Sequence, residues 1–185
     1  LQSSYQDSEI IIIDNASSDN TVESIKAKFS HNQKIRLIQS NVNRGAGGGR
    51  NLGAEHAHGE YLLFVDSDNV IDSKMISYLV EFLDNHGDCG MVGPLMLHKK
   101  NPDIIWLYFA DINMYTSQAK YKGTGEKNME QYEKLIAVGH LPNCFMVRKD
   151  DFEKIGRFDE KYLIMYEEAD LAEKIKRNLK KKILR

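Results

Sequence analysis

Cysteine, proline and long hydrophobic runs are scarce in this chain of 185 residues. The two cysteines, Cys89 and Cys144, lie far apart and without metal-type spacing, which argues against a disulfide framework and against a zinc site. No apolar run approaches the roughly 20 residues that span a bilayer, and no signal peptide opens the chain. The formal net charge of -2 gives no reason to expect nucleic acid as a partner.

The remaining composition is that of an ordinary globular protein. Hydrophobic residues make up 42% of the chain and charged residues 28%. The length suits one domain with a real hydrophobic core. We therefore expect a single domain over residues 1–185, with both cysteines as small buried residues in a reducing, cytoplasmic compartment.

An unbroken apolar run, 61–65, ends at two carboxylates one residue apart, Asp66 and Asp68. Such a run suits a strand buried on both faces of a parallel sheet. Side chains alternate along an extended chain, so the two carboxylates could point the same way. Ligands of open α/β sheets bind beyond the carboxyl ends of the strands, where paired acids could hold a hard divalent cation and a diphosphate. The alternative is a solvated turn.

Apolar and polar segments alternate along the rest of the chain. We predict strands at residues 9–13, 35–38, 90–95, 104–110 and 141–148. We predict helices after an Asn20–Glu23 capping box, after Asp72 as far as His86, after Asp150 as far as Ile155, and through Leu171, Ile175 and Leu179. Residues 116–133 are predicted to be a surface loop. This alternation indicates an α/β fold with a mostly parallel sheet flanked by helices.

Glycine is concentrated between residues 41 and 53. The dinucleotide fingerprint fails because Arg50 stands at the third glycine position, and the P-loop pattern fails because Ala54 and Glu55 replace its Lys and Ser/Thr. We predict a flexible loop that approaches a ligand closely, then a short helix over 51–57. Arg44 and Arg50 would be available for phosphate or for packing. A tight loop with no ligand is the alternative.

The C-terminal part holds an acidic segment and then a basic one. Glu167, Glu168 and Asp170 precede a predicted helix, whose dipole would stabilise each by about 0.3–1 kcal/mol without any catalysis. The basic segment from Lys174 to Arg185 could contact anionic lipid or diphosphate, although a solvated helix face is the commoner outcome. Trp106 could stack on a sugar ring, although an aromatic residue in an apolar run is more often a core residue. His140 is more typical of a surface or hydrogen-bonded loop histidine than of a ligand.

Five motifs then occur in a specific order. They are Ile-Ile-Asp14-Asn15-Ala-Ser17-Ser-Asp19, Asn43-Arg44-Gly45 through Asn51-Leu-Gly53, Phe-Val-Asp66-Ser-Asp68, Gly156-Arg-Phe-Asp159 and Tyr166-Glu167-Glu168-Ala-Asp170-Leu. Their order resembles the inverting glycosyltransferases of family 2 over nearly the whole chain. The resemblance implies a Rossmann-like, three-layer A-type glycosyltransferase fold. It also implies metal-dependent transfer of a sugar from a nucleotide-diphosphate sugar to a glycan or lipid-linked acceptor.

The resemblance further implies roles for the matching residues. The nucleotide-sugar donor would contact Asp14, Asn15, Ser17, Arg44, Gly45, Arg50 and Asp66. Asp66 and Asp68 would hold Mn²⁺ or Mg²⁺, with Asp68 as the more direct ligand. Glu168 stands where the family has its general base, usually an Asp, and Asp170 is the second candidate for that role.

The chain departs from the family pattern at both ends. It begins with Leu1 after the place of the family's first strand, and it stops soon after the last acidic motif. We therefore expect a truncated catalytic domain that lacks the first strand and the C-terminal helices. A sugar nucleotidyltransferase of similar fold and a non-catalytic nucleotide-sugar-binding fragment stay open as alternatives. The basic C-terminal segment would provide any peripheral contact with the cytoplasmic face of a membrane.

Overall fold

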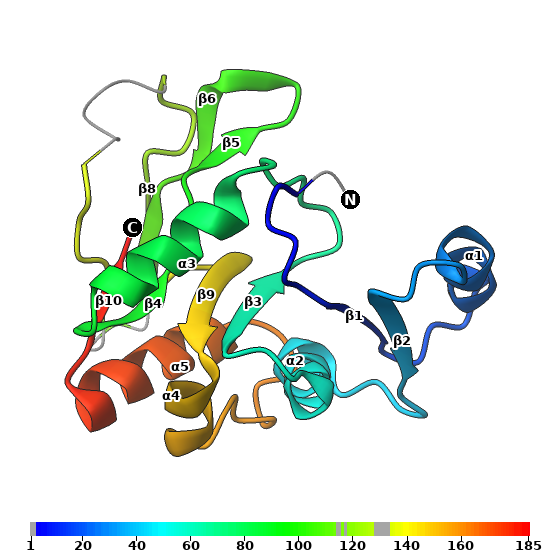
Figure 1. Ribbon diagram of the computed structural model, residues 1–185. Coiled ribbons are helices and arrows are strands. Elements are labelled where there is room, and N and C mark those ends of the chain that lie inside the picture. Colours follow the sequence, from blue (N-terminus) through cyan, green and yellow to red (C-terminus); the bar gives the residue numbers. More distant parts are fainter. Residues whose placement is uncertain (1–2, 114–115, 117, 128–133) are drawn as a thin grey trace.

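The computed structural model describes residues 3–113, 116, 118–127 and 134–185. The helices are α1 Thr21–Phe29, α2 Gly45–His56, α3 Met75–Asn85, α4 Lys149–Lys154 and α5 Glu167–Lys174, which continues into the π-helical turn η2 Ile175–Leu179. The strands are β1 Ile10–Asp14, β2 Ile35–Gln39, β3 Tyr61–Val65, β4 Cys89–Val92, β5 Met96–His98, β6 Asn101–Leu107, β7 Phe109–Asn113, β8 Gln118–Lys122, β9 Cys144–Arg148 and β10 Lys182–Leu184. Figure 1 shows their arrangement.

The central sheet has the strand order β10-β4-β9-β3. Strand β10 runs parallel to β4, whereas β9 runs antiparallel to both of its neighbours. Strands β1 and β2 form a separate parallel pair, which lies with α1 to one side of the molecule (Figure 1). The α/β prediction is confirmed, but the predicted parallel character holds only in part because β9 is reversed.

Alternate residues of β3 face two hydrophobic clusters. Leu62 and Phe64 pack in one cluster with residues of α4 and α5, including Phe152 and Leu171. Leu63 packs against the other, which contains α3 residues such as Leu79. Helices therefore cover both faces of the sheet, as the apolar run predicts. Cys89 and Cys144 are free and buried, as expected.

The predicted glycine-rich loop is wrong, because α2 begins at Gly45 and runs through the whole segment. The missing side chains let this helix lie close to its neighbours. A Cβ atom on Gly53 would lie 3.4 Å from Ile13 of β1, and one on Gly47 would lie 3.2 Å from Phe158. Tertiary packing thus outweighs the low helix propensity of glycine. The short helix predicted at 51–57 is the C-terminal half of this longer one.

Most of the predicted helix-capping hydrogen bonds do not form. Helix α1 follows Asn20 as predicted, but Asn20 makes no side-chain cap hydrogen bond, so no capping box with Glu23 forms. Asp72 does accept a hydrogen bond from the N–H of Lys74, one residue before α3. Asp150 lies inside the first turn of α4, where its negative charge interacts favourably with the helix dipole, but it does not cap the helix.

The region after β4 contains more strands than predicted. The single strand expected at 104–110 is two strands, β6 and β7, and β8 lies within the predicted loop 116–133 and pairs with β7. Residues 117 and 128–133 of that predicted loop lie outside the described part of the chain. The side chains of β8 are mostly exposed, so no hydrophobic periodicity marks it.

The basic C-terminal segment was expected to present a solvated helix face, but only its first part is helical. After η2 the chain enters β10, where Ile183 and Leu184 are buried beside β4. These apolar side chains belong to the core and present no surface to a membrane. Across the described ranges, we find no helix with both the length and the apolar character that crossing a bilayer requires.

Trp106 is not the core residue that was predicted, and His140 is hydrogen-bonded, as one of its two predicted environments has it, but does not lie at the surface. Trp106 is 40% exposed on β6, whereas His140 is only 8% exposed. The main chain of His140 pairs with that of Ala110 in β7. Burial lowers the pKa of His140 to about 4, so the imidazole is neutral at pH 7.

Candidate active site

Three carboxylates converge on the guanidinium of Arg50, which projects from α2. Its Nη2 atom lies 2.7 Å from Oδ1 of Asp66 and 2.9 Å from Oε1 of Glu168. Its Nη1 atom lies 3.1 Å from Oε1 of Glu167. Asp66 follows β3, and the two glutamates begin α5. We call Asp66, Glu167 and Glu168 the acidic cluster, which joins segments about a hundred residues apart.

The main chain of Asn143 holds two members of this cluster together. Its N–H donates a hydrogen bond to Oε1 of Glu168 at 2.9 Å, and its carbonyl accepts one from the N–H of Asp66 at 3.1 Å. Asn143 has a left-handed backbone, with φ of 68°. Asparagine tolerates this conformation better than most residues. It precedes β9, whose pairing with β3 sets its position.

The electrostatics of the cluster follow from its burial. The side chain of Glu168 is 13% exposed, and that of Glu167 is 6% exposed. Burial raises the pKa of Glu168 above its ordinary value, and attraction to Arg50 together with the Asn143 N–H offsets only part of the rise. Burial would lower the pKa of Arg50, but Glu168 and the other two acids raise it overall, so the guanidinium stays charged.

Five of the residues predicted to contact the nucleotide-sugar donor lie at the end of β1, in the loop after it or at the start of α2. Asp14 ends β1, is buried, and accepts a hydrogen bond from the N–H of Ser17 at 3.3 Å. The side chain of Asn15 donates to the carbonyl of Gly45 at 2.9 Å and accepts from the N–H of Arg44 at 2.9 Å. Asn15, Arg44 and Gly45 therefore lie together at the start of α2, whereas Arg50 and Asp66, which were also predicted to contact the donor, lie at the acidic cluster.

A cavity of about 510 Å³ adjoins this group. It is lined by Asn15, Asn43, Gly45, Ala46, Leu163 and Ile164. The carbonyl of Leu163 accepts a hydrogen bond from the N–H of Ala46, which holds the chain before α5 against the start of α2. The side chain of Arg44 is 41% exposed and pairs with Glu160 at 3.8 Å. The cavity thus lies between the predicted donor residues and the segment that leads to Glu168.

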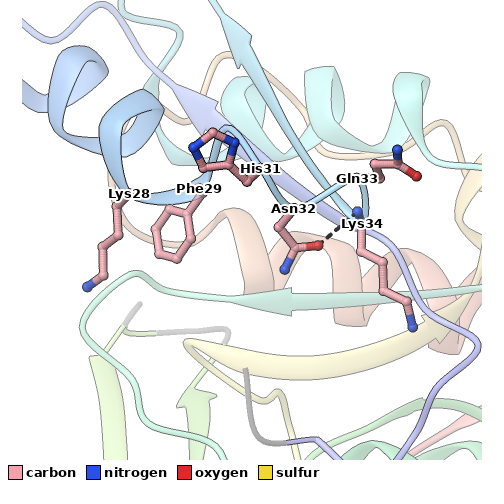
Figure 2. Close-up of a pocket in the computed structure, with 6 residues that line it drawn as sticks. All are labelled: Lys28, Phe29, His31, Asn32, Gln33 and Lys34. Carbon is pink, nitrogen blue, oxygen red and sulfur yellow. Dashed lines mark hydrogen bonds between the residues drawn. The ribbon is translucent and has the colours of Figure 1, made fainter.

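A second hollow, of about 540 Å³, lies at the turn between α1 and β2. Figure 2 shows its lining, which consists of Lys28, Phe29, His31, Asn32, Gln33 and Lys34. None of these residues was predicted to belong to a site. The lining includes two lysines but none of the acids expected to serve catalysis, so we place the candidate site at the acidic cluster.

Two predicted acids do not join the cluster. Asp170 pairs with Lys174 one turn along α5, at 2.8 Å, while Asp68 is exposed beyond β3. Across the described residues, no group of three or more His, Cys, Asp or Glu side chains is arranged to hold a metal. Asp66 and Asp68 could therefore supply at most part of a coordination shell. That suits Mg²⁺ or Mn²⁺, which commonly take one or two carboxylates together with phosphate and water.

The charge balance of the acidic cluster also suits an added cation. Three carboxylates face one guanidinium, and burial leaves Oε2 of Glu167 without a hydrogen-bond partner among the described residues. No role was predicted from the sequence for Glu167 or for Asn143. The adjacent acids at 167 and 168 could have indicated Glu167. Nothing in the sequence indicates that the Asn143 main chain would bind Glu168.

The overall arrangement is that of the A-type glycosyltransferases. GalNAc-T7, crystallised with UDP, GalNAc and Mn²⁺, superposes with a TM-score of 0.73 over 96% of this chain and 36% of that chain, at 16% identity. The S. aureus TarS fragment 1–349 in complex with UDP-GlcNAc gives a TM-score of 0.64 over 94% of this chain and 46% of that chain, at 19% identity. At these identities the likeness shows the fold alone.

The family is shown by sequence. The family model for Glycosyl transferase family 2 matches residues 1–156, so the chain belongs to that family. An uncharacterized glycosyltransferase of Haemophilus influenzae is 36% identical over 87 residues, which is 46% of this chain and 35% of the relative. Glycosyltransferase GlyG of Streptococcus pneumoniae is 23% identical over 165 residues, which is 86% of this chain and 55% of the relative. The matched part thus spans about a third to a half of these two relatives.

Proposed function

We propose that this chain carries the donor site and the base of a metal-dependent, inverting glycosyltransferase. The observation that carries the proposal is the convergence of Asp66 and Glu168 on the same nitrogen of Arg50. Asp66 directly follows β3, at the carboxyl end of a strand, where ligands of α/β folds bind. Glu168 is a buried carboxylate with a raised pKa. Family membership supports the same class of reaction, as do the UDP and UDP-GlcNAc held by the two solved structures.

Glu168 would act as the general base. An acceptor hydroxyl oxygen attacks the anomeric carbon of the donor, and the bond from that carbon to the diphosphate oxygen breaks. The hydroxyl proton passes to the Glu168 carboxylate, and the electron pair of the broken bond leaves with the nucleoside diphosphate. Since one displacement occurs at the anomeric carbon, its configuration is inverted.

Asp14 and its neighbours would bind the nucleotide, while Asp66 and Asp68 would hold Mn²⁺ or Mg²⁺ at the diphosphate. When bound, the cation stabilises the negative charge that develops on the departing diphosphate. Asn15 orders residues 43–45 and so shapes the wall of the adjoining cavity. The acceptor would be a glycan or lipid-linked sugar whose attacking hydroxyl lies beside Glu168.

Calorimetry with UDP and Mn²⁺ tests this proposal. We expect the wild-type protein to bind UDP in the presence of Mn²⁺, and Asp68→Ala to weaken that binding by about tenfold or more, because an anionic metal ligand is lost. Asp103→Ala, which removes an exposed carboxylate on β6, serves as the matched control. Equal binding by wild type and Asp68→Ala would remove Asp68 from the proposed metal site, and absence of UDP binding by the wild type would contradict the proposal.

A further inference from the structure

Arg50 uses both terminal nitrogens within the protein. Nη1 contacts Glu167, and Nη2 contacts both Asp66 and Glu168. The guanidinium also lies 5.6 Å from the centre of the Phe158 ring, and its side chain is only 13% exposed. A planar guanidinium fits several carboxylates in fixed directions, which a lysine ammonium does not. From the sequence, Arg50 was expected to be available for phosphate or for packing, and in the structure its N–H groups face carboxylates.

Glu168 needs such support more than an aspartate would. Glutamate has one more rotatable bond than aspartate, so fixing its carboxylate costs more side-chain entropy. Two contacts fix it here, the Asn143 N–H and Arg50 Nη2, each at 2.9 Å. Both contacts fall on Oε1. The orientation of the carboxylate is therefore set through one oxygen.

We propose that Arg50 is a positioning residue for this reaction, and that it orients Glu168 and links it to Asp66 without serving as a ligand of the donor phosphates. This inference rests on the proposed function. Because Oε1 is held by Arg50 and Asn143, Oε2 is the oxygen that accepts the proton of the acceptor hydroxyl. Arg50 also connects donor and acceptor sides, since Asp66 belongs to the donor site and Glu168 to the base.

The start of α2 strengthens this assignment. The side chain of Asn15 hydrogen-bonds to the main chain of Arg44 and Gly45 at the start of α2, and Arg50 projects from the same helix farther along. Gly49, next to Arg50, lies close to the Asn15 side chain, since a Cβ atom there would be 3.5 Å from its Nδ2. The helix thus fixes the distance between the predicted nucleotide residues and the acidic cluster. A substitution at Arg50 should alter the orientation of Glu168 while leaving the nucleotide end of α2 in place.

The test compares Arg50→Lys and Arg50→Gln with the wild-type protein. The affinity for UDP with Mn²⁺, the kcat for sugar transfer and the melting temperature are measured for each. We expect kcat to fall by about 100-fold in Arg50→Gln and by roughly tenfold in Arg50→Lys, because small misplacement of a reacting group has effects of this size. The Kd for UDP should change by less than about threefold, which a phosphate ligand would not allow. Arg157→Gln is the control, because Arg157 also bridges two carboxylates, Glu55 and Glu153, but at the surface.

A second comparison separates positioning from a general loss of structure. In the Glu168→Asp background, whose shorter carboxylate no longer spans the same distance, Arg50→Lys should lower kcat by less than about threefold further. Independent effects that multiply would overturn the inference, as would a Kd that rises in step with the loss of kcat. An active wild type whose Arg50 variants keep their kcat overturns this inference alone. A wild type that neither binds donor nor transfers sugar overturns the proposed function, and this inference with it.

Discussion

The side chain of Asn51 forms two hydrogen bonds with the main chain of Phe158. Its Nδ2 donates to the Phe158 carbonyl at 3.0 Å, and its Oδ1 accepts from the Phe158 N–H at 3.1 Å. Asn51 is 5% exposed, so water cannot replace these bonds. This pair joins α2 to the chain that leads into α5, and it thereby supports the contact between Arg50 and Glu168.

Asn51→Leu should lower the free energy of unfolding by about 2–4 kcal/mol, because it leaves the buried N–H and carbonyl of Phe158 without partners. Urea unfolding of the two proteins measures the difference. The matched control is Asn85→Ala at the exposed end of α3, where one hydrogen bond to the Glu81 carbonyl is lost. We expect the control to stay within about 0.5 kcal/mol of the wild type. Equal effects of the two substitutions would contradict this account of Asn51.

Gly45→Ala should disturb the start of α2. Gly45 has φ of +70°, and a Cβ atom there would lie 2.3 Å from the carbonyl oxygen of Leu163. The left-handed conformation alone costs about 1–2 kcal/mol for alanine, and the clash adds to it. Thermal or urea unfolding should show a loss above about 2 kcal/mol. Gly87→Ala is the control, since a Cβ atom at Gly87 would meet nothing within 4 Å and its φ is not left-handed.

The buried His140 predicts a loss of stability in mild acid. Burial lowers its pKa from 6.5 in the unfolded chain to about 4 in the folded protein. Stability is therefore fully present above pH 6.5, and it declines as the pH falls toward 4, because the unfolded state binds the proton more readily. The total effect is of the order of 3 kcal/mol. Urea unfolding between pH 7 and pH 4 should show a smaller decline in His140→Gln than in wild type, whereas His98→Gln, at an exposed position on β5, should follow the wild type.

The proposed base predicts an acidic limb in the pH–rate profile. The pKa of Glu168 is raised above 4.5, chiefly by burial, and only the ionised carboxylate can accept the acceptor proton. The kcat should therefore fall as the pH falls through an apparent pKa above 4.5. Glu168→Gln should lower kcat by about 10²–10⁴-fold at neutral pH, the usual contribution of general base catalysis. An acidic limb that persists unchanged in Glu168→Gln would assign it to another group.

Much of the fold was predictable because short runs of apolar residues indicate which segments are buried in the core. The apolar runs at 9–13, 61–65 and 141–148 predicted β1, β3 and β9; the bounds of β3 agree with the run, whereas those of β1 and β9 differ from the prediction. Helix α2 was not predictable from propensity, because its glycines become favourable only against Ile13 and Phe158. The C-terminal strand β10 was missed because its basic flanks resemble those of a solvated helix, whereas its stability comes from pairing with β4.

The candidate site was likewise predictable only in part. The ordered motifs drew attention to Asp66 and Glu168, which the structure places on one guanidinium. The partners of Arg50 could not be derived from the sequence, because they lie 16 and 117 or more residues away along the chain. Asp68 and Asp170 matched their motifs equally well, yet local geometry exposes one and pairs the other with Lys174. Spacing along the chain does not encode such differences.

Because β9 runs antiparallel to β3, the N-terminal end of β9 lies at the acidic cluster. Because Cys144 stands opposite Val65, the residue that enters β9 arrives beside the residue that leaves β3. A strand running the other way would have delivered Asn143 to the far edge of the sheet. The pairing of β9 with β3, and not the length of the connection before β9, places the N–H of Asn143 beside Glu168. Insertions or deletions between β8 and β9 can therefore remodel the neighbouring surface while this anchoring point stays in register.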